Sequence, residues 1–327
     1  MVKHADRVKK GIRNPHRAAE FVTNRLGIWA SSRGYLGTHV LEREWDVLVL
    51  LDTCRVDALR QVAPEYDFLD NIGRLRSVGA TSSEWIGATF DQAWADELQN
   101  TAYLACNGYA DFILECGGDP ERFIGPAPPA YFEQGDWNFA RAADLGRLEH
   151  IWRYEHGDDE SQLGHDEGHA PPRFVTDRAI AVGREFDFER LILHYSQPHS
   201  PYVANAIEEN RELYDYEREP FDYLESGGDR KRVLEAYLDD LRYVLDEIAL
   251  LLDNIDGEVV ISADHGESFG EYGVYGHPAG SLHPQIRNVP WAKTSAIDTG
   301  DYTPKFDPEH TSERDVDETL RALGYAE

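Results

Sequence analysis

Cysteine, lysine and long apolar runs are scarce in this sequence. The three cysteines, at positions 54, 106 and 116, are odd in number and widely spaced, which predicts neither a disulfide framework nor a CxxC metal clip and favours a reducing, intracellular setting. No apolar run reaches the roughly 18 residues of a transmembrane helix, and the N-terminus lacks the apolar core of a secretory signal. We therefore expect a cytoplasmic protein.

Positive charge is also scarce, because 32 basic residues face 61 acidic ones and the net charge is −29. Lysine occurs only at positions 3, 9, 10, 231, 293 and 305. Such a chain lacks the basic face that nucleic acid requires, so we expect no nucleic-acid partner. The charge suits very high salt, where the Debye length is about 3 Å at 1 M, and predicts a halophilic source. The alternative is an ordinary acidic protein.

Charge also divides the chain into three parts. Hydrophobic residues make up 41% of the 327 residues, which is enough for one large α/β domain, placed here at residues 41–297. Residues 1–40 are predicted to form a basic helical arm, and residues 298–327 an acidic tail with a terminal helix. The arm could contact anionic lipid head groups or an acidic partner, which would make the protein peripheral to a membrane. We favour the alternative that it pairs with the chain's own acidic surface.

Two apolar strands are predicted to end in an acid. The run from Val259 to Ile261 leads into Asp264, His265 and Gly266, and the run from Trp45 to Leu51 leads into Asp52. Carboxylate and imidazole ligands at the carboxyl ends of neighbouring strands can converge on one metal ion. The alternative is a surface loop with incidental polar residues.

Other segments alternate between strand and helix patterns. We predict strands at 101–105 and 191–194, and helices from Glu84, at 138–152, at 175–184 and at 230–253. Residues 203–229 are an acidic insertion that is either a lid or simply exposed. The acidic loop at 155–172 could supply further metal ligands but is predicted to be solvated; its candidates are His156, Asp158, His165, Asp166 and His169.

Hydroxyl and imidazole groups follow two further strands or turns. Thr81, Ser82 and Ser83 precede the helix pattern from Glu84, where a hydroxyl either caps the helix or acts as a nucleophile. His199 lies between two prolines, which stiffen the chain, so it could bind an anion or shuttle a proton. The alternative is a structural histidine in a turn.

The order of these motifs resembles the alkaline phosphatase/sulfatase superfamily, in particular its sulfatase-like branch. The resemblance covers roughly residues 44–292. It rests on Asp52-x-x-Arg55-x-Asp57, the hydroxyl segment, Pro198-His199-Ser200-Pro201-Tyr202, a helix, Asp264-His265-Gly266-Glu267, and Gly276-His277 before Val289-Pro290. The resemblance implies an α/β fold with a mostly parallel central sheet flanked by helices on both faces.

The resemblance also implies roles for single residues. Asp52, Asp264 and His265 match metal ligands, and the nucleophile, itself a hydroxyl on the metal, is expected at Thr81, with Ser82 as the second candidate. The other implied catalytic residues are His199 and His277, which would contact the anionic group, and Arg55, which would orient Asp52. The implied cofactor is one or two divalent cations, Zn²⁺ or Mn²⁺, or Ca²⁺ in a sulfatase.

Two departures shape the expected function. Thr53 stands where many sulfatases have a second Asp, and the segment Thr81–Trp85 lacks the Pro and Arg of the C/S-x-P-x-R context that formylglycine requires. We therefore expect a metal-dependent hydrolase or transferase, such as a phosphodiesterase, acting through Thr or Ser on a phosphate ester of a small molecule, glycan or lipid. The alternatives are a sulfatase and a non-catalytic module that binds an anionic glycan or lipid.

Overall fold

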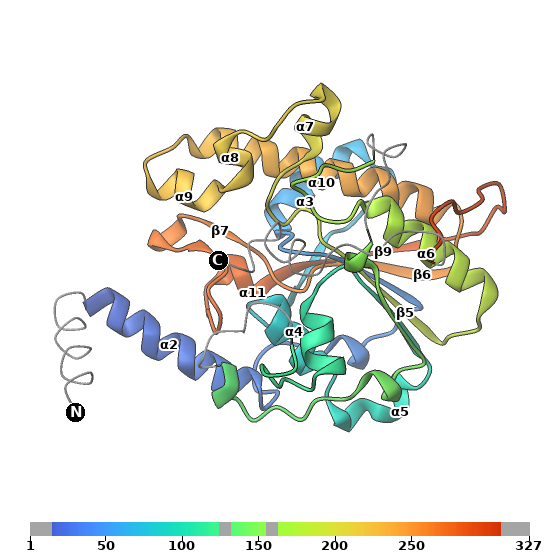
Figure 1. The fold of residues 1–327 in the computed structure, drawn as a ribbon, viewed down its shortest axis with the longest axis horizontal. Coiled ribbons are helices and arrows are strands. Elements are labelled where there is room, and N and C mark those ends of the chain that lie inside the picture. The colour runs from blue at the N-terminus through green and yellow to red at the C-terminus, as the bar shows by residue number, and fades with distance from the viewer. Residues whose placement is uncertain (1–14, 124–131, 155–162, 309–327) are drawn as a thin grey trace.

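The computed structural model describes residues 15–123, 132–154 and 163–308 (Figure 1). The predicted C-terminal helix, His156 and Asp158 lie outside these residues. The strands are β1 (Val47–Leu51), β2 (Gly73–Arg76), β3 (Thr101–Ala105), β4 (Arg147–His150), β5 (Arg190–Tyr195), β6 (Gly257–Ser262), β7 (Ser268–Phe269), β8 (Tyr275–Gly276) and β9 (Asn288–Ala296). The α-helices are α2 (Pro15–Ser31), α3 (Val56–Val62), α4 (Ser82–Thr89), α5 (Ala95–Leu98), α6 (Pro172–Glu185), α7 (Ala204–Glu209), α8 (Asp215–Arg218), α9 (Pro220–Glu225), α10 (Arg230–Leu252) and α11 (Pro284–Arg287).

A mostly parallel sheet forms the centre of the molecule. Its strand order is β2-β9-β6-β1-β5-β3-β4, and the five strands from β6 to β4 are parallel. Strand β9 runs antiparallel to β6, and β2 runs antiparallel to β9. All five residues of β1 are buried, as expected for a central strand that is covered on both faces. The carboxyl ends of β1, β5 and β6 therefore meet at one edge of the sheet.

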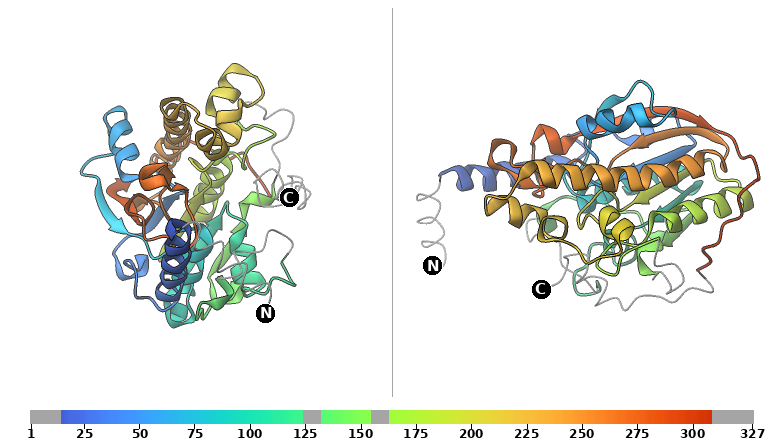
Figure 2. Two further views of the ribbon diagram at one scale, coloured as in Figure 1. Left: turned by 90° about the vertical axis from the view of Figure 1, so that its left-hand side faces the viewer. Right: turned by 90° about the horizontal axis from the view of Figure 1, so that it is seen from above.

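Helices cover both faces of this sheet, as the sequence predicts. Figure 1 shows α3, α6 and α10 on one side and α4 and α5 on the other, and the turned views of Figure 2 agree. The long helix α10 buries one apolar face, which comprises Val233, Ala236, Tyr237, Leu241, Val244, Leu245, Ile248, Leu251 and Leu252. The predicted α/β fold with helices on both faces is confirmed.

The predicted helix at 138–152 is wrong. Its second half is strand β4, which pairs in parallel with β3, and its first half holds only a single 3₁₀ turn at Ala142–Asp144. This segment lies beside β3, which would otherwise have an unpaired edge. Pairing with β3 outweighs the helix propensity of the alanines in the segment. The insertion at 203–229 forms three short helices, α7, α8 and α9.

Part of the predicted N-terminal arm, residues 15–31, is the helix α2. Its last residue, Ser31, accepts a hydrogen bond of 3.1 Å from Nη2 of Arg287, so this end of α2 is fastened to the main body. Within the described ranges, no helix has both the length and the hydropathy of a membrane-spanning segment.

Candidate active site

Two acids and one histidine meet where β1 and β6 end. Asp52 follows β1, and Asp264 and His265 follow β6, its parallel neighbour in the sheet. One ligand atom from each side chain lies within 4.8 Å of the others, and all three side chains are buried. The structure therefore brings together the metal ligands that the sequence predicts.

The free lone pairs of this cluster point at one another. Nε2 of His265 lies 3.6 Å from Oδ1 of Asp52 and 3.4 Å from Oδ2 of Asp264. Nδ1 of His265 lies 2.9 Å from the carbonyl oxygen of Gly266, which only accepts, so Nδ1 holds the proton and Nε2 presents a lone pair. Oδ1 of Asp52 and Oδ2 of Asp264 are buried and accept no hydrogen bond from the described residues, although Nε2 of His194 lies 3.5 Å from Oδ2 of Asp264. Such a donor set fits a divalent cation.

The charges of the cluster also indicate a site for a divalent cation. Burial raises the pKa of Asp52 well above its ordinary value, and the carboxylates of Asp264 and Glu267 raise it further. Burial also acts to raise the pKa of Asp264, but His265 and His194 lower it overall. Burial lowers the pKa of His265 to about 4, so this imidazole is neutral at pH 7. Two buried carboxylates beside a neutral imidazole repel each other, and a cation would relieve that repulsion.

Neighbouring groups hold the two carboxylates in place. Oδ2 of Asp52 accepts hydrogen bonds from Nδ2 of Asn107 (3.1 Å) and Oγ of Ser82 (3.2 Å). Oδ1 of Asp264 accepts from the backbone N–H groups of Thr53 (3.3 Å) and His265 (2.8 Å). The remaining oxygen of each carboxylate is left facing the cluster. Asn107 also follows a buried strand, as the two acids do, but Asn107-Gly108 is equally a turn signal, so the sequence alone does not assign it to the site.

A tyrosine–histidine pair stands behind Asp264. His194, in β5, places Nε2 at 3.5 Å from Oδ2 of Asp264, and its Nδ1 lies 2.8 Å from the hydroxyl of Tyr103. Both side chains are completely buried. With the Tyr103 hydroxyl donating to Nδ1, the Nε2–H of His194 is directed at the carboxylate. The sequence shows His194 only as the end of a strand, so its role depends on the packing of β3, β5 and β6.

The structure places Ser82, rather than Thr81, at the cluster. Oγ of Ser82 lies 3.2 Å from Oδ2 of Asp52 and 3.3 Å from Nε2 of His265. Thr81 is the N-cap of α4, and its hydroxyl accepts a hydrogen bond of 3.2 Å from the N–H of Glu84. Of the two candidates for the nucleophile, the second, Ser82, lies beside the cluster, and the first, Thr81, caps the helix.

Two further histidines line the same site. The ring of His277 lies 4.5 Å from that of His265 and 5.2 Å from that of His199, measured between centroids. Burial acts to lower the pKa of His277, but Glu267, whose Oε1 lies 2.6 Å from Nδ1, raises it overall. Burial lowers the pKa of His199, and His277 lowers it further. One imidazole thus favours the protonated form and the other the neutral form.

Arg55 does not have the predicted role of orienting Asp52. Its guanidinium binds both oxygens of Asp57, at 2.9 and 2.7 Å, and Oε1 of Glu271 at 2.9 Å. A longer bond of 3.4 Å reaches the backbone carbonyl of Glu267. These contacts use four of the five N–H donors of the side chain, which therefore braces the loop after β6.

The acidic loop contributes no ligand to the cluster from its described part. His165 lies 3.1 Å from the carbonyl oxygen of Arg211, and His169 lies 3.0 Å from that of Ser200. The loop was predicted to be solvated, but His169 is buried, so this end of the loop packs against the rest of the protein. Its ring lies 5.4 Å from that of His199, which makes it a neighbour of the site.

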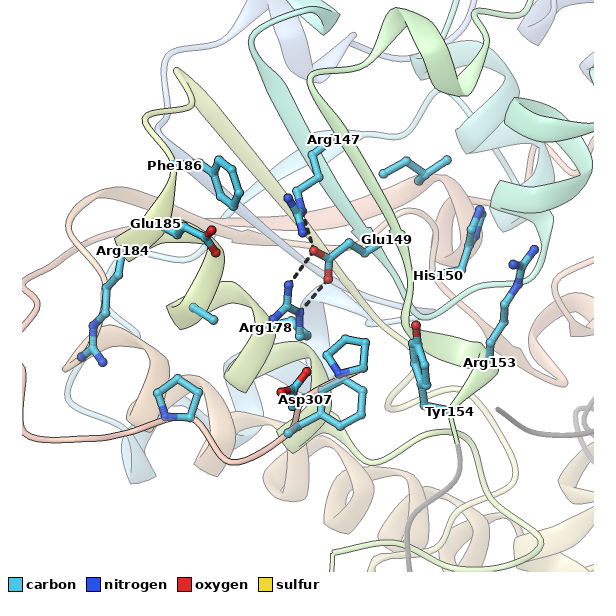
Figure 3. Close-up of a pocket in the computed structure, with 15 residues that line it drawn as sticks. Arg147, Glu149, His150, Arg153, Tyr154, Arg178, Arg184, Glu185, Phe186 and Asp307 are labelled. Atoms are coloured by element: carbon cyan, nitrogen blue, oxygen red, sulfur yellow. Dashed lines mark hydrogen bonds and ion pairs between the residues drawn. The ribbon is translucent and has the colours of Figure 1, made fainter. Parts of the chain in front are cut away.

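A cavity of about 770 Å³ lies elsewhere, beside β4 and α6 (Figure 3). Its arginines are already engaged by acids: Glu149 binds both Arg147 and Arg178, as the dashed lines in Figure 3 show, and Arg184 binds Asp298. Strands β3 and β5 separate β4 from β1. The arginines of this cavity are neutralised by acids, whereas the buried cluster has the chemistry of a metal site, so we place the candidate active site at the cluster.

Comparisons with known proteins give only distant similarities. No protein-family model matches the sequence, and no curated protein is significantly similar to it. The soluble domain of lipooligosaccharide phosphoethanolamine transferase A from Neisseria meningitidis is a similar solved structure, with 16% identity, a TM-score of 0.46, and coverage of 76% of this chain and 75% of that one. The integral membrane form of that transferase gives 15% identity, a TM-score of 0.48, and coverage of 92% and 60%.

A protein in the alkaline phosphatase superfamily from Vibrio parahaemolyticus is also similar, with 13% identity, a TM-score of 0.41, and coverage of 87% of this chain and 70% of that one. This chain spans 60% of the length of the integral membrane transferase. At such low identities the function has to be argued from this chain's own site. In its motif order the chain resembles the alkaline phosphatase/sulfatase superfamily.

Proposed function

We propose that the protein is a metal-dependent hydrolase or transferase of phosphate esters, with Ser82 as its nucleophile. One observation carries this proposal: the Ser82 hydroxyl lies at 3.2 and 3.3 Å from two members of a buried Asp-Asp-His cluster whose remaining lone pairs are unpaired. A hydroxyl at an ordinary helix cap has no such neighbours. The position is that of a nucleophile held beside a cation site.

Asp52, Asp264 and His265 would hold the cation. A mixed oxygen and nitrogen donor set suits Zn²⁺ or Mn²⁺, whereas Ca²⁺ is bound by oxygen ligands, so the imidazole argues against Ca²⁺. The bound cation would lower the pKa of a nearby hydroxyl and neutralise negative charge on the phosphoryl oxygens.

The chain's own residues supply the remaining chemistry. Oδ2 of Asp52 accepts the Ser82 hydroxyl hydrogen bond and orients the oxygen that would attack phosphorus. His277, held by Glu267, favours the protonated form, so it can stabilise a non-bridging oxygen or give a proton to the leaving group. Nδ1 of His199 lies 2.6 Å from the carbonyl oxygen of Ser200 and donates its proton to it. Nε2 is therefore a hydrogen-bond acceptor, and it can bind an anionic group through a proton that the group carries.

A comparison of two neighbouring hydroxyls tests the proposal. Ser82→Ala should lower kcat on p-nitrophenyl phosphate or its diester by at least about 10³-fold, because a nucleophile is lost. Thr81→Val is the matched control, because it removes only a cap, and it should retain activity within about tenfold. Zn²⁺ content, measured by mass spectrometry, should be the same in both variants.

The opposite pattern, in which Thr81→Val is inactive and Ser82→Ala is active, would show that the nucleophile is misassigned. A wild-type enzyme that cleaves p-nitrophenyl sulfate but neither phosphate ester would instead support the sulfatase alternative. If the wild type bound no divalent cation and Asp264→Asn changed no measured property of the protein, a non-catalytic binding module would be favoured.

A further inference from the structure

Helix α2 presents large apolar side chains to solvent. Val22, Leu26 and Trp29 are 55%, 58% and 47% exposed, and their spacing of four and three residues puts them on one face of the helix. Tyr35 is also exposed, and its ring lies 5.7 Å from that of Trp29. A stripe of this kind is unusual on a chain that is otherwise dominated by acidic residues.

This stripe is fixed rigidly to the active-site end of the molecule. Gly27 and Gly280 touch through their backbones: a Cβ added at Gly27 would lie 1.9 Å from the carbonyl oxygen of Gly280. A Cβ at Gly280 would in turn lie 1.9 Å from the carbonyl oxygen of Asn24. Gly280 follows the active-site residue His277 by three positions. The position of the exposed face relative to the site is therefore set by close backbone packing.

Other exposed apolar residues gather at the same end. Within the described residues, nine large hydrophobic side chains are exposed, and six of these lie on α2, just after it, or near α11: Val22, Leu26, Trp29, Tyr35, Tyr272 and Leu282. Tyr272, at the turn between β7 and β8, is 91% exposed. Figures 1 and 2 show α2, α11 and the β7–β8 turn at one end of the molecule. The exposed apolar surface is thus concentrated at the end of the molecule that carries α2 and α11.

The charge of the N-terminal segment indicates which partner binds this apolar surface. The first 25 residues contain seven basic and only two acidic residues, although the whole chain has a net charge of −29. An apolar stripe that includes Trp, next to a basic segment, is the combination that binds the interface of an anionic bilayer. A second copy of the chain would bring two basic segments together, and a water-soluble acidic partner would not require the apolar stripe.

We propose that α2 and the adjoining turns dock on an anionic lipid bilayer. Docking in this orientation would bring the loop that follows His277 to the membrane, which on the proposed function makes a lipid-borne phosphate ester the substrate class. The docking itself stands independently of the proposed function, whereas the substrate class rests on it. In high salt the charges are screened, so Leu26 and Trp29 would supply most of the binding.

Vesicle flotation with the full chain tests the docking. The wild type should float with phosphatidylglycerol vesicles, and Leu26→Gln combined with Trp29→Gln should weaken that binding at least about tenfold. Ile297→Gln is the matched control, because Ile297 is 71% exposed but lies outside the cluster of exposed residues around α2. It should bind like the wild type. The double variant should retain activity on soluble p-nitrophenyl phosphate, because it leaves the catalytic residues unchanged.

Three results would overturn the docking: no flotation of the wild type, equal flotation of the double variant, or, at low salt where the charges are not screened, equal flotation with phosphatidylcholine vesicles alone. A dimer that the double variant converts to monomer would show that the surface joins two copies instead. Asp264→Asn should float normally, which separates docking from catalysis. A wild type that floats but cleaves no phosphate ester would refute the substrate class and leave the docking intact.

Discussion

The buried ion pair between Glu84 and Arg287 should be the most sensitive point of the scaffold around the site. Both side chains are fully buried, and Nη2 of Arg287 lies 3.1 Å from Oε2 of Glu84. Glu84 also accepts hydrogen bonds from the backbone N–H groups of Ala80 and Gly280. Arg287 donates to the carbonyl oxygens of Val78 (2.9 Å) and Ser281 (2.7 Å) and to the Ser31 hydroxyl. The pair thus joins α2, α4 and α11.

Removing only the cation should be costly. Arg287→Met keeps the volume but leaves the Glu84 carboxylate buried without its partner, which we expect to lower the free energy of unfolding by about 3–5 kcal/mol. Glu84→Gln combined with Arg287→Met removes both charges and should therefore cost less than Arg287→Met alone. Urea unfolding at constant high salt, followed by far-ultraviolet circular dichroism, measures all three proteins.

An exposed pair is the control for this measurement. Lys231 and Glu235 lie 3.3 Å apart on the surface of α10, so Lys231→Met should change stability by less than about 1 kcal/mol. If Arg287→Met cost no more than Lys231→Met, or if the double variant were less stable than Arg287→Met, the buried charge would not be the cause. The reasoning from burial and pairing would then be refuted.

The remaining predictions concern single residues. His194→Phe should weaken Zn²⁺ binding about tenfold or more in calorimetry, because it removes the group that orients a metal-binding carboxylate. Burial acts to raise the pKa of Glu271, but Arg55 lowers it overall, from 4.5 to about 2. The ionised carboxylate of Glu271 should therefore stabilise the fold fully above pH 4.5 and lose this effect as the pH falls towards 2. Glu271→Gln should remove this pH dependence of the urea unfolding midpoint. Gly27→Ala should lower the Tm, because its Cβ would collide with the backbone of Gly280.

The positions of the proposed metal ligands could be predicted because the ends of buried strands can be recognised in a sequence. A short branched apolar run predicts a buried strand, and parallel strands place their carboxyl ends at one edge, so Asp52 and Asp264 were expected to meet. The same logic applies to Asn107 and His194. For these two residues the strand-end argument was not sufficient. An asparagine before a glycine, as at position 107, also predicts a turn. A histidine within an apolar strand, as at position 194, has no polar neighbour in the sequence that would indicate a site.

Strand β4, at the edge of the sheet, and strand β9, which contains a proline, were harder to predict than the central parallel strands. β4 is only half-buried, and its residues alternate between charged and apolar types too briefly to give a strand pattern. β9 contains Pro290, which lowers the expectation of a strand, yet it pairs with β6 on one side and β2 on the other. In both cases pairing with a distant strand decides the structure, and local sequence does not record that partner.

The sequence itself contains a reason to prefer Ser82 to Thr81 as the proposed nucleophile. Thr81-Ser82-Ser83-Glu84 has the spacing of a capping box, in which the first hydroxyl accepts a hydrogen bond from the N–H of the fourth residue. The structure has that bond, and the cap has extended dihedral angles, φ −141° and ψ 161°. A hydroxyl committed to the helix end is a poorer candidate for attack than the next one along. Ser82 is the first helical residue, and its side chain faces Asp52 instead of capping the helix.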